Sequence, residues 1–261
     1  MIVSRQNRLI KDIRRLRRSK GDRALLEGPH TVAAALAAGL DLEIVLATPE
    51  VAADPSVAVL LEPLGGLLQL VDADVLDSVA DVDTPRGLVA VAVLPRRGVE
   101  ALPRAPGGLY VYADGLQEPG NLGALARVAE AAGVAGLALA PGSAHPNHPR
   151  ALRGSAGSLL RLPVAREVEP SALERRLEGL SPTWLALVPR DGSDLYATTL
   201  PESTLVLLLG GEGSGLSSAA LLHSDLRVTL PMRAPVESLN VTVAAALVLY
   251  EIVRRRDRAA G

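Results

Sequence analysis

The sequence predicts an α/β protein of two domains, on three observations. The chain has 261 residues, 48% of them hydrophobic, so it can bury one large core or two smaller ones. Apolar runs of strand length alternate with helical patterns. Residues 95–108, rich in proline and glycine, divide these elements into two sets. We therefore expect a small N-terminal α/β domain (1–97), a linker (98–107) and a second α/β domain with a parallel sheet (108–261).

The first predicted element is a basic amphipathic helix. Residues 1–23 contain nine basic and two acidic residues, a net charge of +7, whereas 24–100 contain three basic and twelve acidic residues. Apolar residues recur at helical spacing from Leu9 to Leu16, which predicts a stripe docked on a core with arginines facing outward. Such a face suits nucleic-acid phosphates, but a solvated helix face is an equally good interpretation. An anionic membrane surface is a weaker one, because the stripe lacks aromatic anchors.

The remaining elements follow in order. A helix is expected from Pro29, which suits a first helical position, to Gly39, which suits a left-handed cap. Strands are expected around Leu25-Leu26 and at 42–47, 67–71 and 87–94, and then, in the second domain, at 109–113, 136–140, 161–165, 184–188, 204–209 and 226–230. In a doubly wound parallel sheet, ligands bind at the carboxyl ends of strands, so a ligand is expected at the loops after Leu209 and Leu230.

Composition excludes several kinds of chemistry. The chain has no cysteine, which excludes disulfides and thiolate chemistry, and its four scattered histidines make a metal site an unfavoured interpretation. The N-terminus is charged and lacks an apolar signal core, and the apolar run 241–250 is shorter than the roughly 20 residues of a membrane span. A cytoplasmic protein without a metal is expected.

Two segments carry the strongest functional signal. Gly210-Gly-Glu-Gly-Ser-Gly215 permits close backbone approach to a ligand but lacks the spacing of a dinucleotide-binding turn, and it lies too near the end of the chain to open a Rossmann sheet. Alone, it would be a structural turn. The segment Leu230-Pro-Met-Arg-Ala-Pro-Val-Glu-Ser-Leu-Asn-Val241 follows, with Ser238 and Asn240 placed to cap the last helix.

These two segments and the earlier Asn121-Leu-Gly-Ala-Leu-Ala-Arg127 together resemble the SpoU/TrmH family (SPOUT superfamily) of RNA ribose 2′-O-methyltransferases, over about residues 108–253. The turn 84–87 resembles the end of the substrate-binding domain in the rRNA-modifying branch. The resemblance implies a trefoil-knotted catalytic domain, S-adenosylmethionine as methyl donor and a homodimer whose subunits complete each other's sites. It also implies a cofactor site made of Gly210, Gly211, Glu212, Gly213, Leu230, Met232, Ser238, Leu239 and Asn240, although Met232 could be core and the role of Glu212 stays open.

The resemblance assigns catalytic roles to Asn121, Arg127, Ser238 and Asn240. Taken alone, Asn121 could be a helix cap and Arg127 a surface residue. The family places this arginine next to the target ribose. Because an arginine is not easily deprotonated, we expect Arg127 to orient the ribose and its phosphate, and to assist loss of the 2′-hydroxyl proton only in a tuned environment.

Six arginines are candidate RNA ligands. Arg150 and Arg153 are spaced to share one helical face, and the N-terminal helix adds Arg14, Arg15, Arg17 and Arg18. His145 and His148 lack the companions of a metal site, so a loop pair is expected. With no Phe and five Tyr or Trp in all, recognition through phosphates and shape is favoured over base stacking.

The sequence therefore predicts methyl transfer to a ribose 2′-oxygen of RNA, with 23S ribosomal RNA as the favoured substrate. A tRNA ribose methyltransferase and an RNA-binding or assembly factor without catalysis are the alternatives.

Overall fold

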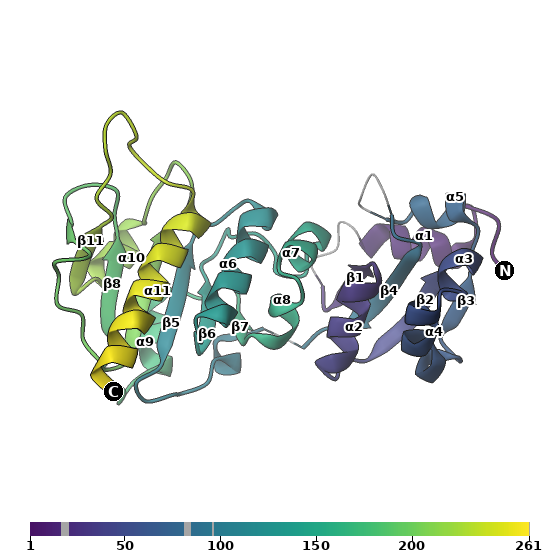
Figure 1. Ribbon diagram of the computed structural model, residues 1–261, viewed down its shortest axis with the longest axis horizontal. Coiled ribbons are helices and arrows are strands. Elements are labelled where there is room, and N and C mark those ends of the chain that lie inside the picture. Colours follow the sequence, from purple (N-terminus) through teal and green to yellow (C-terminus); the bar gives the residue numbers. More distant parts are fainter. Residues whose placement is uncertain (17–20, 81–84, 96, 261) are drawn as a thin grey trace. The chain divides into compact units, whose positions relative to one another are not determined.

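The computed structural model describes residues 1–16, 21–80, 85–95 and 97–260, and these form two compact units (Figure 1). Unit 1 comprises Met1–Arg96 together with Asn147–Arg161, and unit 2 comprises Arg97–Pro146 together with Leu162–Gly261. The N-terminal unit therefore includes a segment from the middle of the chain. Each unit is described by itself.

Unit 1 is a four-stranded mixed sheet with helices around it. The strand order is β1-β4-β2-β3, in which β4 is antiparallel to both neighbours and β2 is parallel to β3. The strands are β1 (Arg23–Glu27), β2 (Leu42–Ala47), β3 (Leu68–Leu70) and β4 (Leu88–Val93). The helices are α1 (Arg8–Leu16), α2 (Pro29–Ala37), α3 (Pro49–Ala52), α4 (Pro55–Leu61), the 3-10 helix η1 (Glu62–Leu64), α5 (Ala73–Asp77), α7 (Pro149–Gly154) and α8 (Ser158–Arg161). The four predicted strands and the helix opened by Pro29 are confirmed, and Gly39 follows that helix with a φ of 70°.

The amphipathic α1 docks as its pattern predicts. Ile10 and Ile13 are fully buried in the core of unit 1, with Leu9 and Leu16 packed against it. One of its arginines is not free to face outward, because Arg14 donates hydrogen bonds to the carbonyl and hydroxyl oxygens of Ser78 at the end of α5, at 3.1 and 2.8 Å. Arg14 thus helps to fix α1 against α5.

The segment around α7 and α8 corrects one sequence prediction. A strand was expected from Arg161 to Ala165, but Arg161 ends helix α8 and only Val164–Ala165 form strand β7. The preceding α7 packs against β1, and Asn147 donates a hydrogen bond to the Gly21 carbonyl. Gly157, with a φ of 90°, lies so close to α2 that an added Cβ would be 2.7 Å from the Cβ of Ala34. Two short helices joined by a turn, rather than a strand, therefore form this segment.

Unit 2 is built on a seven-stranded parallel sheet of order β7-β6-β5-β10-β8-β11-β9. Its strands are β5 (Leu109–Asp114), β6 (Gly136–Leu139), β7, β8 (Thr183–Leu187), β9 (Ser193–Asp194), β10 (Leu205–Gly210) and β11 (Leu226–Thr229). Its helices are the 3-10 helix η2 (Val99–Ala101), α6 (Pro119–Ala131), α9 (Pro170–Arg176), α10 (Ser218–Leu222) and α11 (Val241–Ala260). The parallel α/β sheet is as predicted; the short edge strand β9 was not.

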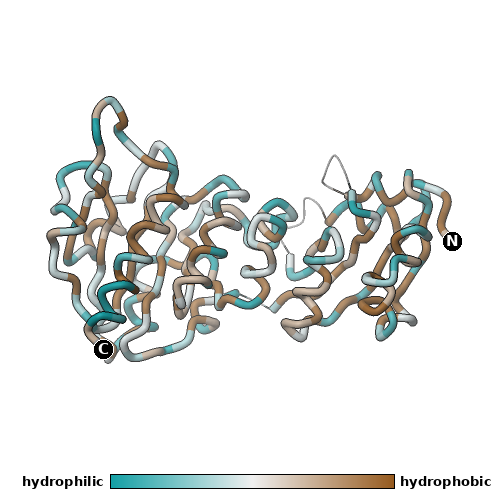
Figure 2. Tube along the Cα trace, in the orientation of Figure 1, coloured by the Kyte–Doolittle hydropathy of each residue, from teal (hydrophilic) through white to brown (hydrophobic). Residues whose placement is uncertain are grey.

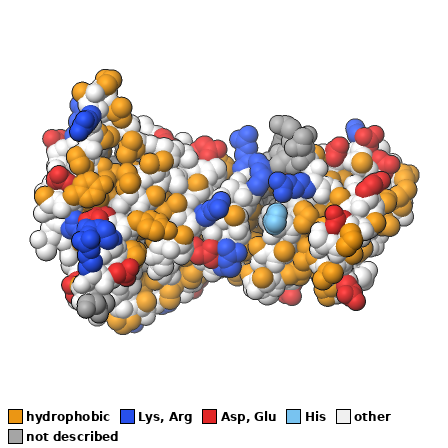
Figure 3. Space-filling model, in the orientation of Figure 1, with side chains coloured by type: hydrophobic (Ala, Val, Ile, Leu, Met, Phe, Trp, Pro, Cys, Tyr) orange, Lys and Arg blue, Asp and Glu red, His pale blue; other side chains and the backbone are white. Residues whose placement is uncertain are grey.

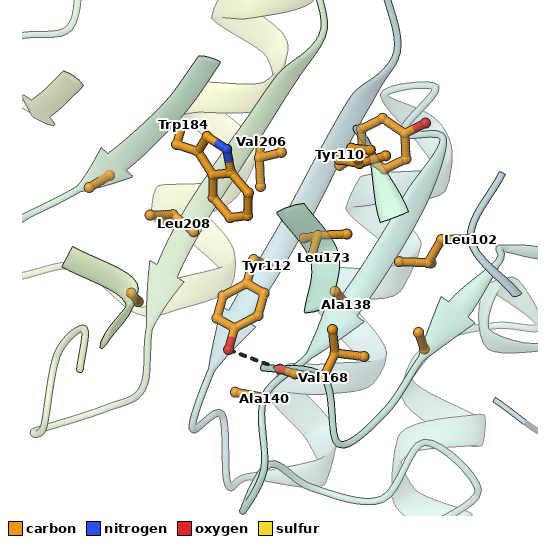
Figure 4. Packing of buried hydrophobic residues seen from close by; sticks show 14 residues of the cluster. Leu102, Tyr110, Tyr112, Ala138, Ala140, Val168, Leu173, Trp184, Val206 and Leu208 are labelled. Atoms are coloured by element: carbon orange, nitrogen blue, oxygen red, sulfur yellow. Dashed lines mark hydrogen bonds between the residues drawn. The ribbon is translucent and has the colours of Figure 1, made fainter. Parts of the chain in front are cut away.

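Two layers of helices cover this sheet. The strands appear as apolar segments in Figure 2, and their alternate residues face opposite sides. On one side, Tyr112, Trp184 and Leu208 pack with residues of α9 and α10 (Figure 4). Tyr112 donates a hydrogen bond of 3.0 Å to the Val168 carbonyl, and burial raises the pKa of its hydroxyl. On the other side, α6 and α11 lie side by side (Figure 1).

The C-terminal half of α11 is fixed by a charged cluster. Arg254 donates two hydrogen bonds of 2.7 Å to the Glu251 carboxylate, and Arg255 donates one of 2.6 Å. Arg255 also donates to the Leu195 and Tyr196 carbonyls, at 2.8 and 3.1 Å. The hydrogen bonds from Arg254 first, and then the one from Arg255, lower the pKa of Glu251 to about 2. Glu251 is therefore ionised over the whole neutral range and orients the two arginines.

This cluster predicts a stability change with a defined pH window. Because the pKa of Glu251 falls from 4.5 to about 2 on folding, its contribution is fully present above about pH 4.5 and is lost as the pH falls toward 2. We expect Glu251→Gln to lower the melting temperature at pH 7, and its difference from the wild type to shrink steadily below pH 4.5. Thermal melts from pH 7 to pH 2.5 measure this. Asp257→Asn serves as the control, because Asp257 is an exposed acid on the same helix. A difference in melting temperature between Glu251→Gln and the wild type that does not change with pH would contradict the prediction.

Candidate active site

A pocket of about 690 Å³ lies at the carboxyl ends of β8, β10 and β11. Three loops build it, one after each strand, and the start of α11 closes it with Val241 and Ala244. The loop residues include Val188–Arg190 after β8, Gly211–Leu216 after β10, and Leu230, Met232 and 237–240 after β11. A pocket of this volume has the size of a typical small-molecule site, and its position follows from the parallel sheet.

The predicted cofactor residues all line this one pocket. They come from the end of β10 and from the loops after β10 and β11, and they are Gly210, Gly211, Glu212, Gly213, Leu230, Met232, Ser238, Leu239 and Asn240. Leu230 is buried, Met232 is half-buried, and Ser238, Leu239 and Asn240 are exposed at the pocket. The wall thus combines backbone groups, apolar side chains and a few polar ones, as small-molecule sites do.

The glycine loop requires glycine because it passes close to other backbone. An added Cβ on Gly210 would lie 2.3 Å from the Gly215 carbonyl carbon, and one on Gly211 would lie 2.3 Å from the Gly115 carbonyl oxygen. Asp114, at the end of β5, holds both ends of this loop. Its carbonyl accepts a hydrogen bond from Gly211 N at 2.8 Å, and its carboxylate accepts one from Ser217 N at 2.6 Å.

Three of the predicted site residues are connected by hydrogen bonds beside the pocket. The Asn121 amide nitrogen donates to Glu212 of the glycine loop, and the Asn240 amide nitrogen donates to the Asn121 oxygen at 3.2 Å. Thr242 adds a hydrogen bond from its hydroxyl to the Asn121 carbonyl at 3.3 Å. This network links α6, the glycine loop and the start of α11. Asn121 therefore fixes the relative positions of three elements that meet at the pocket.

The two asparagines differ in their capping roles. Asn240 caps α11, since its oxygen accepts hydrogen bonds from Thr242 N at 2.9 Å and Val243 N at 3.4 Å. The suggestion that Asn121 opens α6 is wrong, because α6 begins at Pro119 and Glu118 is its N-cap. The Glu118 carboxylate accepts a hydrogen bond from Asn121 N at 2.7 Å. With its backbone capped by Glu118, the Asn121 side chain is available to the network.

Arg127 lies apart from the pocket. It is exposed on α6 and is not among the residues that line the pocket. Asn121 and Arg127 are six residues apart on one helix, which places them about 120° apart around its axis. A single chain therefore brings together three of the four predicted catalytic residues and leaves the arginine outside.

The candidate RNA-binding arginines are in different environments. Arg15 pairs with Asp12 at 3.3 Å and Arg153 with Glu27 at 3.4 Å, and Arg14 is held by Ser78. Arg150 is exposed on α7, whereas Arg17 and Arg18 lie outside the described residues. His148 caps α7 by accepting a hydrogen bond from Arg150 N at 3.1 Å.

Sequence reasoning missed two charged residues of the pocket, Arg190 and Glu237, which form an ion pair at 2.6 Å. Arg190 follows β8 in the chain, and the rule that ligands lie at strand carboxyl ends could have identified it. Within the described parts of the chain, no group of three metal-ligating side chains is found, and no helix is long and apolar enough to cross a membrane.

Comparison with known proteins gives consistent results. Residues 108–250 match the SpoU rRNA Methylase family, and residues 7–90 match the MRM3-like substrate binding domain. An uncharacterized tRNA/rRNA methyltransferase of Synechocystis is 36% identical over 98% of this chain and 94% of its own length. The 23S rRNA (guanosine(2553)-2′-O)-methyltransferase RlmP of Bacillus subtilis is 32% identical over 96% of this chain and 98% of its own.

A solved structure extends the comparison to the fold. The SpoU methyltransferase AviRb from Streptomyces viridochromogenes, in complex with AdoMet, is 26% identical to this chain. The two structures superpose with a TM-score of 0.87, over 97% of this chain and 99% of the AviRb chain.

The parallel sheet and the glycine-lined pocket at its carboxyl edge are those of an RNA methyltransferase of the SPOUT type. The chain belongs to the SpoU rRNA Methylase family. The predicted family, α/β fold class, enzyme class of RNA ribose 2′-O-methyltransferase and methyl donor S-adenosylmethionine are thereby confirmed. The trefoil knot is an expectation of this fold.

The close backbone approach at Gly210 predicts a selective loss of cofactor binding in Gly210→Ala. A methyl group there must displace the Gly215 backbone, so we expect the affinity for S-adenosylhomocysteine to fall at least tenfold, measured by calorimetry. Gly136→Ala, in β6, is the matched control, because an added Cβ there is also crowded, at 2.9 Å from Leu102 Cδ2, whereas Gly136 does not line the pocket. Equal losses in the two variants would show that contact at Gly210 is not the cause.

Proposed function

We propose that this protein transfers a methyl group from S-adenosylmethionine, bound in the pocket of unit 2, to a ribose 2′-hydroxyl of 23S ribosomal RNA. The observation that carries the proposal is the glycine-lined pocket beside the Asn121, Glu212 and Asn240 network in a chain of this family. The named 23S rRNA activity of RlmP, which matches nearly the full length of the chain, supports the substrate. The cytoplasmic location expected from the sequence agrees with this substrate.

The pocket fits the cofactor on its own geometry. Gly210 and Gly211 leave backbone where side chains would otherwise project, and Leu230, Met232 and Leu239 offer an apolar wall suited to an adenine ring. The bound cofactor would supply an electrophilic methyl group on a sulfonium. Such a transfer depends mainly on alignment of the donor with the attacking oxygen, so the protein contributes by holding both partners in position.

The residues have separable roles in this proposal. Asn240 and Glu212 hold the Asn121 side chain, and this network keeps the glycine loop and the start of α11 in place around the cofactor. Ser238 lines the pocket and is exposed there, where it can donate a hydrogen bond to cofactor or ribose. Arg127 binds the phosphate and orients the ribose of the target nucleotide, because a guanidinium forms bidentate hydrogen bonds with phosphate.

A homodimer would bring Arg127 to a pocket. Val243, Leu247 and Tyr250 recur at helical spacing along α11 and are 50%, 42% and 53% exposed. Figure 3 shows hydrophobic side chains at the surface in the region of α11. We propose that a second copy of the chain covers this stripe, and that its α6, which packs beside α11 in each subunit, supplies Arg127 to the pocket of its partner.

Substrate RNA is assigned to unit 1 as well. The proposed domain division is 1–97 for RNA binding, 98–107 as linker and 108–261 for catalysis. Helix α7 lies within the last of these ranges but belongs to unit 1. Exposed Arg150 on α7, with the basic α1, provides cations for RNA phosphates. The match to a substrate-binding domain over residues 7–90 supports this assignment.

The experiment that tests the function is methyl transfer from tritiated S-adenosylmethionine to unmodified 23S rRNA and, separately, to tRNA. We expect label in 23S rRNA at a linkage resistant to alkaline cleavage. Label in tRNA instead would assign the substrate to the alternative class. Cofactor binding without label in either pool would favour a binding or assembly role.

Arg127→Ala is expected to reduce methyl transfer by about 100-fold or more, as loss of a positioning charge does, while cofactor affinity stays within about twofold. Arg127→Lys should restore only part of the rate, because an ammonium cannot form the bidentate contact. Single-turnover rates and calorimetry separate the two effects. Arg175→Ala, an exposed arginine of the same unit, is the control, and an equal loss there would remove the special role of Arg127.

Leu247→Asp is expected to convert the dimer to a monomer, because it places a charge in the apolar stripe. Light scattering after gel filtration measures the mass. The monomer should still bind cofactor but should lose methyl transfer, since Arg127 would no longer reach a partner's pocket. Leu222→Asp changes a leucine that is 86% exposed on α10 and serves as the control. A Leu247→Asp variant that remains dimeric contradicts this interface.

A further inference from the structure

An ion pair joins two loops of the pocket. Arg190, in the loop after β8, contacts Glu237, in the loop after β11, with a distance of 2.6 Å between Nη2 and Oε1. Both residues line the pocket, and their side chains are 66% and 76% exposed. β8 and β11 are neighbours in the sheet, so their own hydrogen bonds already hold the two loops near each other. An exposed pair of this kind adds little to stability, and its side chains can turn to other partners at small cost.

The charge of the pocket matches the charge of the methyl donor. Among the residues that line it, the charged ones are Arg190, Glu212 and Glu237, which gives a net charge of −1 from one positive and two negative groups. S-adenosylmethionine carries a sulfonium, an ammonium and a carboxylate, a net charge of +1. Glu212 already accepts a hydrogen bond from Asn121. Arg190 and Glu237 therefore form the pair of opposite charges that is available to a ligand.

Only the amino-acid end of the cofactor calls for a pair of opposite charges. Its adenosine part is neutral and suits the apolar and backbone groups, whereas its amino-acid part ends in a carboxylate and an ammonium on the same carbon. Arg190 is the one basic side chain of the described pocket lining, so it is the only lining residue that can neutralise the carboxylate. A neighbouring Glu237 can then accept from the ammonium.

We propose that Arg190 and Glu237 bind the amino-acid end of S-adenosylmethionine, the guanidinium contacting its carboxylate and the Glu237 carboxylate contacting its ammonium. In the absence of the cofactor, the two side chains neutralise each other. This assignment rests on the proposed placement of the cofactor in this pocket.

The test compares two ligands that differ in the amino-acid end. S-adenosylhomocysteine has that end, and 5′-methylthioadenosine keeps the adenosine and sulfur but lacks it. Dissociation constants of both are measured by calorimetry for the wild type, Arg190→Gln and Glu237→Gln at constant ionic strength. Arg166→Gln is the control, since Arg166 pairs with Glu167 at 2.9 Å on the surface of the same unit and does not line the pocket. Circular dichroism melts establish that each variant is folded.

We expect each pocket variant to bind S-adenosylhomocysteine about tenfold more weakly, as loss of a charged hydrogen bond does, and to bind 5′-methylthioadenosine within twofold of the wild type. Equal weakening of both ligands would overturn the proposal and indicate a closing contact over the pocket. Unchanged affinities would also overturn it and leave only a surface ion pair. If the folded wild type binds neither ligand, the proposed placement of the cofactor in this pocket is wrong. That outcome is seen in the wild type alone, so it is distinguishable from a wrong assignment of Arg190 and Glu237, which only the variants reveal.

Discussion

The site depends on the parallel pairing of β5 with β10 and on the aspartate at the end of β5. Register places Gly210 opposite Asp114, and Asp114 then binds both the first and last parts of the glycine loop. With the loop fixed, Glu212 reaches Asn121 on α6, and Asn121 reaches Asn240 at the start of α11. Backbone pairing in the buried sheet thus determines where the exposed polar groups of the pocket lie.

Regular elements were predictable because their signals are local. The strand from Leu42 to Ala47 and the helix from Pro29 are set by apolar runs and by the preferences of proline and glycine, which neighbours do not override. The strand expected at Arg161–Ala165 failed because a short apolar run is compatible with a helix end, and here Arg161 completes α8. A two-residue edge strand such as β9 has almost no pattern of its own.

The pocket residues were predictable from a family resemblance more than from their chemistry. Gly210 and Asn240 belong to recognisable segments, and both line the pocket. The hydrogen bond between Asn121 and Asn240 joins positions 119 residues apart, and no local sequence pattern predicts such a contact. Nor does the sequence show which arginines are already engaged, as Arg14 is with Ser78 and Arg153 with Glu27. Arg190 was missed because a single arginine in a loop resembles any solvated one.

The membership of α7 in the N-terminal unit limits how modular this protein can be. Ala151 and Leu152 are buried, and the helix that carries them packs on β1, although it is encoded between two strands of the other unit. A fragment ending in the proline-rich linker would leave β1 without this cover, and a fragment beginning there would carry an apolar helix without its strand. Exchange of the N-terminal unit among relatives would therefore have to carry both of its segments together, residues 1–96 and 147–161.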